Sequence, residues 1–206
     1  MPRPVASGAG DLLVSPQNTN GETLLARIPY FDPALATGRA AKAYADLPAL
    51  NIFKMLGHTG DLLEGFSRFG GLLLNKTSLD PVLREIAIVR VGVLSKASYE
   101  VHQHEAISRR IGMSDELIKA IHEGPESGAF DATQRLVVAF TDDVVANVRA
   151  SDATFLPMRD ALGDKALQEL TIVIGFYMLV SRFLETFDVD IEKGESPVVR
   201  VGGGPG

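Results

Sequence analysis

Apolar residues recur through the middle of the chain mostly at spacings of three and four, which is the period of an α-helix. The pattern predicts helices over approximately 33–46, 51–57, 61–75, 81–95, 98–111, 114–122, 131–149, 152–162 and 165–186. We expect N-caps at Asp32, Asp80, Ser98, Ser114 and Ser151, and left-handed C-terminal caps at Gly57, Gly112 and Gly124. Because short connections favour antiparallel neighbours, we predict an all-α bundle of about eight or nine helices.

The two ends of the chain differ in composition from its middle. Residues 1–25 are rich in Gly, Pro, Ser, Asn and Thr, and the last residues have the same character. Such segments lack the apolar period of a packed helix. We therefore expect a flexible N-terminal segment over 1–25, a single all-helical domain over 26–192 and a flexible tail over 193–206.

Charge and cysteine content exclude several classes of function. The 206 residues include 20 Lys and Arg against 26 Asp and Glu, a net charge of −6, so we expect no nucleic-acid partner and no attraction to anionic lipid. The chain contains no cysteine, which excludes disulfides, thiolate metal ligands and dithiol redox chemistry.

Neither a membrane span nor a signal peptide is expected. The longest uncharged apolar run, Leu170 to Ser181, is shorter than the roughly 20 residues that a membrane helix needs. The first residues lack the continuous apolar stretch of a signal peptide. We expect a cytoplasmic protein with no membrane partner.

The predicted helix 81–95 carries a candidate buried carboxylate, Glu85. On a helical wheel Glu85 shares its face with Val82, Ile88 and Val89, and the opposite face is apolar as well. A helix that is apolar on both sides is normally buried on both sides. Glu85 is then a candidate for acid/base work, or else a structural carboxylate paired with an arginine such as Arg182.

The predicted helix 98–111 carries the sharpest signal. Glu100 and His104 fall in its core-facing stripe, whereas His102 and Gln103 point away. Side chains four residues apart on a helix are neighbours, and a carboxylate beside an imidazole sets its tautomer and raises its basicity. The pair is typical of acid/base machinery, and equally of a histidine satisfied structurally by a neighbouring glutamate.

A metal site is a third interpretation of these residues. Glu100 and His104 could supply two ligands and Glu85 a third. However, no second histidine shares that face, since His102 points about 160° away from it. We therefore expect neither a metal ion nor an organic cofactor.

Three stretches of the chain, residues 83–121, 132–145 and 167–190, resemble the carboxymuconolactone decarboxylase and alkylhydroperoxidase D superfamily. The resemblance covers most of residues 28–190. It implies the all-helical bundle of that superfamily and assembly into a homo-oligomer.

The peroxidase branch of the superfamily has a reactive motif of Glu, eleven residues, Cys, two residues, Cys, three residues and His. In this chain Glu85 and His104 keep the register, but Ala97 and Glu100 stand at the two cysteine positions. A dithiol peroxidase needs a thiolate nucleophile and a second sulfur to resolve it. This chain is therefore not expected to be a thiol peroxidase.

The decarboxylase branch also lacks the cysteine pair and is similar in keeping a glutamate four residues before the histidine. The resemblance implies a cofactor-free lyase that acts on a small carboxylated lactone or a related enolisable acid. His104 would protonate the substrate carbon, and Glu100 would orient the His104 imidazole. Glu85 would hold a second proton or shape the pocket. The alternatives are a non-catalytic oligomer that binds a small ligand, and a proton-transfer isomerase or hydratase. An open, apolar cavity over His104 with one or two cationic groups would favour catalysis.

Overall fold

The computed structural model describes residues 26–193 and confirms the all-α fold. The described chain contains eight α-helices and two short 3₁₀ helices, and no strand. The helices are α1 Gly38–Asp46, α2 Asn51–Leu56, α3 Leu62–Asn75, α4 Pro81–Ser95, α5 Ser98–Arg110, α6 Asp115–Glu123, α7 Ala132–Asn147 and α8 Asp152–Phe187. The segments expected to be flexible, 1–25 and 193–206, lie outside the described residues except for Lys193.

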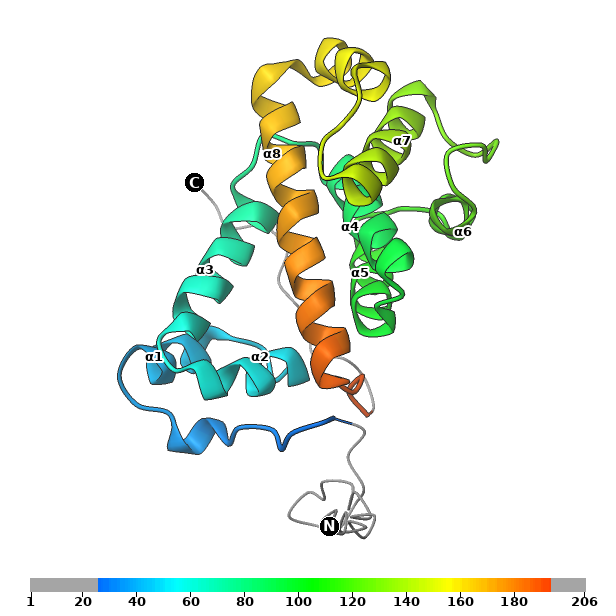
Figure 1. The fold of residues 1–206 in the computed structure, drawn as a ribbon. Coiled ribbons are helices and arrows are strands. Elements are labelled where there is room, and N and C mark those ends of the chain that lie inside the picture. Colours follow the sequence, from blue (N-terminus) through cyan, green and yellow to red (C-terminus); the bar gives the residue numbers. More distant parts are fainter. Residues whose placement is uncertain (1–25, 194–206) are drawn as a thin grey trace, which may run out of the picture.

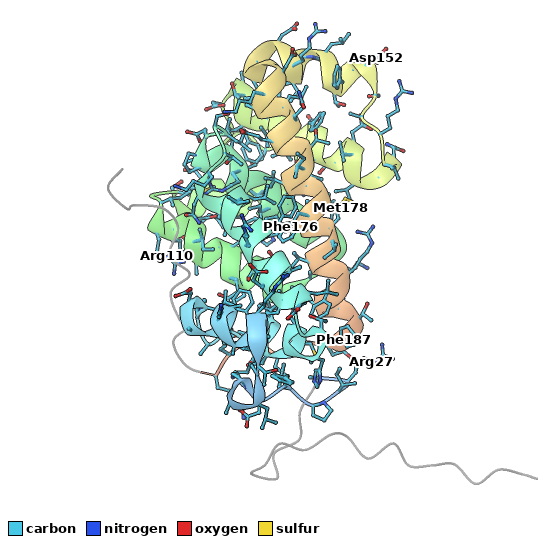
Figure 2. The ribbon with its side chains drawn as sticks, turned by 90° about the vertical axis from the view of Figure 1, so that its left-hand side faces the viewer. Arg27, Arg110, Asp152, Phe176, Met178 and Phe187 are labelled. Carbon is cyan, nitrogen blue, oxygen red and sulfur yellow. The ribbon has the colours of Figure 1, made fainter. Side chains whose placement is uncertain are left out.

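Helices α4 and α8 form the centre of the bundle. Helix α4 packs against α5, α6, α7 and α8, and α8 also packs against α3, α5 and α7. Figure 1 shows α8 running between α3 on one side and the α4, α5 and α7 group on the other, with α1 and α2 beside α3. The side-chain view in Figure 2 shows Arg27 next to Phe187 at one end of the molecule, where the Arg27 amide donates to the Phe187 carbonyl at 2.9 Å.

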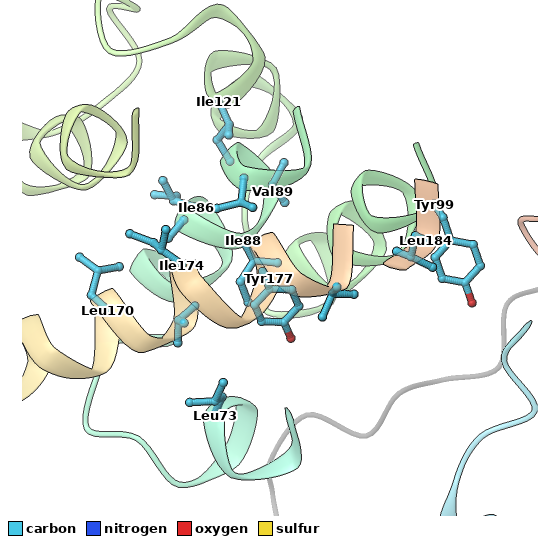
Figure 3. Packing of buried hydrophobic residues seen from close by; sticks show 14 of the residues in the cluster. Leu73, Ile86, Ile88, Val89, Tyr99, Ile121, Leu170, Ile174, Tyr177 and Leu184 are labelled. Carbon is cyan, nitrogen blue, oxygen red and sulfur yellow. The ribbon is translucent and has the colours of Figure 1, made fainter. Parts of the chain in front are cut away.

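Helix α4 is central because it is buried on every side. Its residues from Arg84 to Gly92 are all buried, as the apolar pattern on both of its faces predicts. The Asp80 carboxylate caps the helix by accepting from the Val82 and Leu83 amides. Figure 3 shows α4 side chains packing against α8, with Leu73 of α3 on the other side of α8.

The structure corrects the predictions for residues 33–46 and for Gly57. The predicted helix 33–46 divides into a 3₁₀ helix, Pro33–Leu35, and α1, because Ala36 is extended between them. Gly57 has a φ of −55°, so it continues the turn of α2 into the second 3₁₀ helix, Gly57–Thr59, and is not a left-handed cap. The glycine is needed there for space, because a Cβ at this position would collide with the Tyr44 hydroxyl and the Phe31 ring.

Five other caps also test the sequence prediction. Ser114 is the N-cap of α6, as predicted, and Gly112 and Gly124 have positive φ values of 92° and 100°. Ser98 was predicted as an N-cap, but the N-cap of α5 is Ala97. Ser151 holds the N-cap position of α8 without a side-chain cap hydrogen bond.

The last two predicted helices, 152–162 and 165–186, meet at a break inside α8. Gly163 has a φ of 72° and a ψ of 168°, which is not a helical conformation. The first turns of α8 are therefore bent away from its long apolar part, as Figure 1 shows at the yellow end of the helix. The prediction of two helices is confirmed by this break.

Helix α8 is long and apolar enough, by length and composition, to cross a membrane. Its most apolar window has a mean hydropathy of 1.5, and 44% of that window is buried inside the bundle. A core helix of a soluble protein passes the same test, so the finding is weak evidence for a span. A cytoplasmic location stays a prediction.

Candidate active site

The structure brings the three predicted site residues together in one buried cluster. The Nδ1–H of His104 donates to Glu85 Oε2 at 2.7 Å, and His104 Nε2 lies 3.1 Å from Glu100 Oε1. The exposed fraction of these residues is 0% for Glu85, 3% for Glu100 and 6% for His104. Glu85 comes from α4 and the other two from α5, so the imidazole is held between carboxylates of two helices.

Close contact between α4 and α5 makes this cluster possible. A Cβ at Gly92 of α4 would lie 3.0 Å from Val101 Cγ2 and 3.6 Å from Glu100 Cβ. The 3.0 Å distance to Val101 is tighter than ordinary packing, so Gly92 lets the two helices approach where a side chain would hold them apart. The chain turns between the helices at Lys96, which is left-handed with a φ of 57°.

Glu85 has a cationic partner, but it is not Arg182. The neighbouring Arg84 donates from Nε to Glu85 Oε1 at 3.2 Å, and both side chains are buried. Arg182 is exposed and donates to the Met178 carbonyl. The site therefore contains two carboxylates and two cationic side chains when His104 is protonated, a balanced set that lowers the cost of burying charge.

The electrostatics favour the protonated imidazole. Burial alone would lower the pKa of His104, but the negative charges of Glu85 and Glu100 outweigh burial and raise it from 6.5 to about 10. The raised pKa makes His104 an imidazolium at neutral pH. A histidine of this kind holds a proton that it can give to a bound molecule.

One carboxylate oxygen of Glu100, Oε1, is available as a hydrogen-bond acceptor. This atom is buried without a well-directed hydrogen bond, although it lies close to His104 Nε2. A buried carboxylate oxygen normally has a hydrogen-bond partner. Oε1 can thus accept a proton or a hydrogen bond from a molecule in contact with it.

A cavity of about 640 Å³ opens over this cluster. Three helices form most of its wall, and residues 45–48 and 52–53 also contribute. The lining includes, from α5, Glu100, His104 and Ile107; from α8, Phe176, Tyr177 and Val180; and from α3, Phe66, Gly70 and Leu74. The volume lies within the range of small-molecule pockets. Most of the lining is apolar; it includes the carboxylates of Asp46 and Glu100 but no Lys or Arg, so His104 is its cationic side chain.

Two cavity residues were not anticipated from the sequence. Tyr177 lies edge-on to His104, with ring centroids 4.8 Å apart and an interplanar angle of 82°. Gln103 was predicted to point away from the core, yet it is buried and lines the cavity. A helical wheel of α5 could not predict either residue as part of the cavity. Tyr177 comes from a different helix, α8, and Gln103 is buried through its contact with Glu192.

Glu192 connects the segment after α8 to the cavity wall. Its Oε1 accepts from the Tyr99 hydroxyl and from the Asn51 amide, both at 2.6 Å. Its Oε2 accepts from Gln103 Nε2 at 2.7 Å. Tyr99 and Gln103 line the cavity, so this carboxylate fixes two of its polar side chains from behind.

The described residues contain no group of three or more His, Cys, Asp and Glu side chains arranged to hold a metal ion. At the predicted cluster both ring nitrogens of His104 already face carboxylate oxygens. Metal ligation would need a ring nitrogen that points at the ion. The geometry of the cluster is that of a charge-paired imidazolium.

The fold and the site define a class: an all-helical bundle with a buried glutamate–histidine–glutamate cluster below an apolar cavity. Residues 60–143 match the model of the Carboxymuconolactone decarboxylase family. The uncharacterized protein YnjA of Escherichia coli (strain K12) is 29% identical over 126 residues, 60% of this chain and 69% of that protein.

Solved structures agree with this match at the level of the fold. An alkylhydroperoxidase AhpD core from Ralstonia eutropha JMP134, an uncharacterized peroxidase-related protein, has a TM-score of 0.71 and 20% identity, covering 82% of this chain and 93% of that chain. The debrominase Bmp8, as a cysteine-to-alanine variant in complex with 2,3,4-tribromopyrrole, has a TM-score of 0.64 and 17% identity, covering 90% of this chain and 94% of that chain. The family match and these folds together support the resemblance of this chain, which contains no cysteine, to the carboxymuconolactone decarboxylase and alkylhydroperoxidase D superfamily.

Proposed function

We propose that this protein is a cofactor-free lyase of the decarboxylase type, acting on a small carboxylated lactone or a related enolisable acid. The observation that carries the proposal is the position of His104, a buried imidazolium between two carboxylates at the wall of an apolar cavity. A proton donor of this kind is the group that such a reaction needs most.

The proposed reaction breaks the bond between the substrate's α-carbon and its carboxylate. The electron pair of that bond moves into the conjugated carbonyl, which leaves CO₂ and an enolate. His104 then gives its proton to carbon and becomes neutral, and it recovers a proton from water. In sum the substrate carboxylate is replaced by hydrogen, and one proton is consumed.

The residues around His104 have separate roles in this proposal. Glu85 holds the Nδ1 side of the ring at 2.7 Å and thereby directs Nε2 toward the cavity wall. Arg84 lies 3.2 Å from Glu85 Oε1 and balances its charge within the bundle. Glu100 stabilises the imidazolium from the other side and can relay its proton.

The apolar cavity supports the loss of CO₂. Charge concentrated on a carboxylate becomes dispersed in the transition state, and an apolar wall opposes the concentrated form more strongly. A bundle of this fold also accommodates a small ring, since the debrominase Bmp8 was solved in complex with 2,3,4-tribromopyrrole. Both points favour a small cyclic substrate.

One observation favours a second candidate, a proton-transfer isomerase. The cavity lining carries no Lys or Arg to hold an anionic substrate, and Glu100 Oε1 is a buried acceptor without a well-directed partner. A neutral enolisable molecule would suit this lining, with Glu100 removing a proton and His104 returning it to another atom. This reaction would exchange substrate hydrogen with D₂O but release no CO₂.

A screen of lactone acids and small aromatic acids by thermal shift identifies ligands, because binding raises the melting temperature. Ligands that respond are then assayed for CO₂ release and for deuterium incorporation. We expect His104→Gln to remain folded, with a lower melting temperature than wild type, and to lower turnover by about 10²- to 10⁴-fold. His122→Gln, at the surface, is the matched control and should turn over normally. Equal turnover by wild type and His104→Gln would contradict the proposal and favour a ligand-binding protein.

A further inference from the structure

The hydroxyl of Tyr177 is a polar group of the cavity that the proposed mechanism leaves unused. Tyr177 is 4% exposed and lines the cavity beside His104. Within residues 26–193 its hydroxyl makes no hydrogen bond to the protein, whereas the hydroxyls of Tyr30, Tyr44 and Tyr99 each donate one. A buried tyrosine hydroxyl normally has a partner.

The orientation of Tyr177 points its hydroxyl at the space that a ligand would fill. Figure 3 shows the ring leaving α8 away from Ile88 of α4, toward the side where Leu73 of α3 lies. The cavity lies on this side, between α3 and α8, with Phe66 and Phe176 in its wall. The edge contact with the His104 ring holds the tyrosine ring in place.

The hydroxyl remains a proton-bearing donor at all ordinary pH values. Burial raises the pKa of Tyr177 well above its usual range, and the charges of Glu100 and Glu85 raise it further, against a smaller opposite effect of Arg84. A neutral phenol donates a hydrogen bond, and it does so best to an oxygen that carries negative charge.

We propose that Tyr177 donates a hydrogen bond to the carbonyl oxygen of the substrate and stabilises the enolate that forms there. The assignment rests on the proposed acid/base function, in which negative charge develops on that oxygen while His104 handles the proton. It also defines the ligand: a small ring that presents one oxygen to Tyr177 and its reacting carbon to His104. A preorganised donor of this kind stabilises developing charge without reorganisation.

The test uses 4-nitrophenolate, a small aromatic oxyanion that resembles an enolate in charge and shape. Its binding to the full-length protein is followed by its visible absorbance, at a pH where it is ionised in solution. We expect Tyr177→Phe to keep the melting temperature of wild type and to weaken binding by about 10- to 100-fold, the ratio for a lost hydrogen bond to a charged group. Equal affinity of wild type and Tyr177→Phe would overturn the assignment, and so would failure of wild type to bind the anion at millimolar concentration.

Tyr99→Phe is the matched control, because it removes a hydroxyl from the same cavity that is already engaged by Glu192. It is expected to lower the melting temperature and to change the affinity for 4-nitrophenolate much less than Tyr177→Phe does. An equal loss of affinity in both variants would overturn the specific role of Tyr177. His104→Gln separates the two proposals: if it turns over substrate normally, the acid/base function fails, whereas the anion affinity of Tyr177→Phe reports on the hydroxyl alone.

Discussion

His104 and Glu85, nineteen positions apart, are joined by a hydrogen bond of 2.7 Å that connects α5 to α4 in the centre of the bundle. Glu85 is fully buried, and His104 is 6% exposed and lines the cavity, so little of the pair is exposed to bulk water. Arg84 completes the arrangement on the far side of the carboxylate. Removal of one charge would leave the others buried without compensation.

We expect Glu85→Gln to destabilise the protein by about 3 to 5 kcal/mol, the range for breaking a buried ion pair. The neutral amide would face two buried cations, Arg84 and protonated His104, and the pKa of His104 would fall. Urea unfolding monitored by circular dichroism measures the loss. Glu123→Gln is the control, since its ion pair with Lys119 is exposed and should contribute little. Wild-type stability in Glu85→Gln would contradict the contribution of this buried ion pair.

Stability should fall as the pH rises toward 10. The pKa of His104 is raised in the folded protein from 6.5 to about 10, so the folded state binds this proton more tightly than the unfolded chain does. The resulting stabilisation is fully present below pH 6.5 and is lost progressively as the pH rises through about 10. Melting temperatures of wild type and His104→Gln across this range should converge at the alkaline end. A constant difference between them would contradict the raised pKa.

Gly92 should be sensitive to the smallest substitution. In Gly92→Ala the new Cβ would press on Val101 Cγ2 at 3.0 Å and force α4 and α5 apart, at a cost of about 1 to 3 kcal/mol. Gly65→Ala in α3 is the matched control, because nothing lies within 4 Å of its Cβ position. Alanine is the better helix former, so the control should gain about 0.5 to 1 kcal/mol. Thermal unfolding of both variants measures the contrast, and a stabilised Gly92→Ala would show that the helices have room.

The parts of the site that the sequence predicted lie within single helices. Glu100 and His104 are four residues apart, so the helical period alone placed them on one buried face, and the two-sided apolar pattern of α4 did the same for Glu85. The distance between α4 and α5 depends on tertiary packing, which a helical wheel does not show. The wheel also gave no reason to pair Arg84 with Glu85, because adjacent residues of a helix normally point in different directions. Tyr177 lies within an apolar run, and no motif in the neighbouring sequence indicates that it belongs to the site. Its position at the cavity depends on which helices pack against α8. Gln103 is buried by Glu192, which is 89 residues further along the chain.

Self-association is the remaining expectation, and the surface of α3 and α8 gives it a physical reason. Phe69 and Leu72 of α3 are 43% and 46% exposed, and Ile172 and Leu179 of α8 are 47% and 52% exposed. The two pairs are neighbours, because the Phe69 ring packs edge-on against Phe176, which lies between Ile172 and Leu179 on the same stripe of α8. A contiguous apolar patch of this kind is typical of an interaction surface.

We predict that the protein forms a closed homo-oligomer through this patch, since a surface that pairs with a copy of itself closes by symmetry. Light scattering at micromolar concentration should give a mass above 22.1 kDa for wild type. Leu179→Glu would bury a charge in the interface and should shift the protein toward monomer. Leu35→Glu changes an equally apolar residue, 70% exposed and outside α3 and α8, and should leave the mass unchanged. A monomeric wild type would contradict the prediction, and an oligomer that persists in Leu179→Glu would move the interface away from this patch.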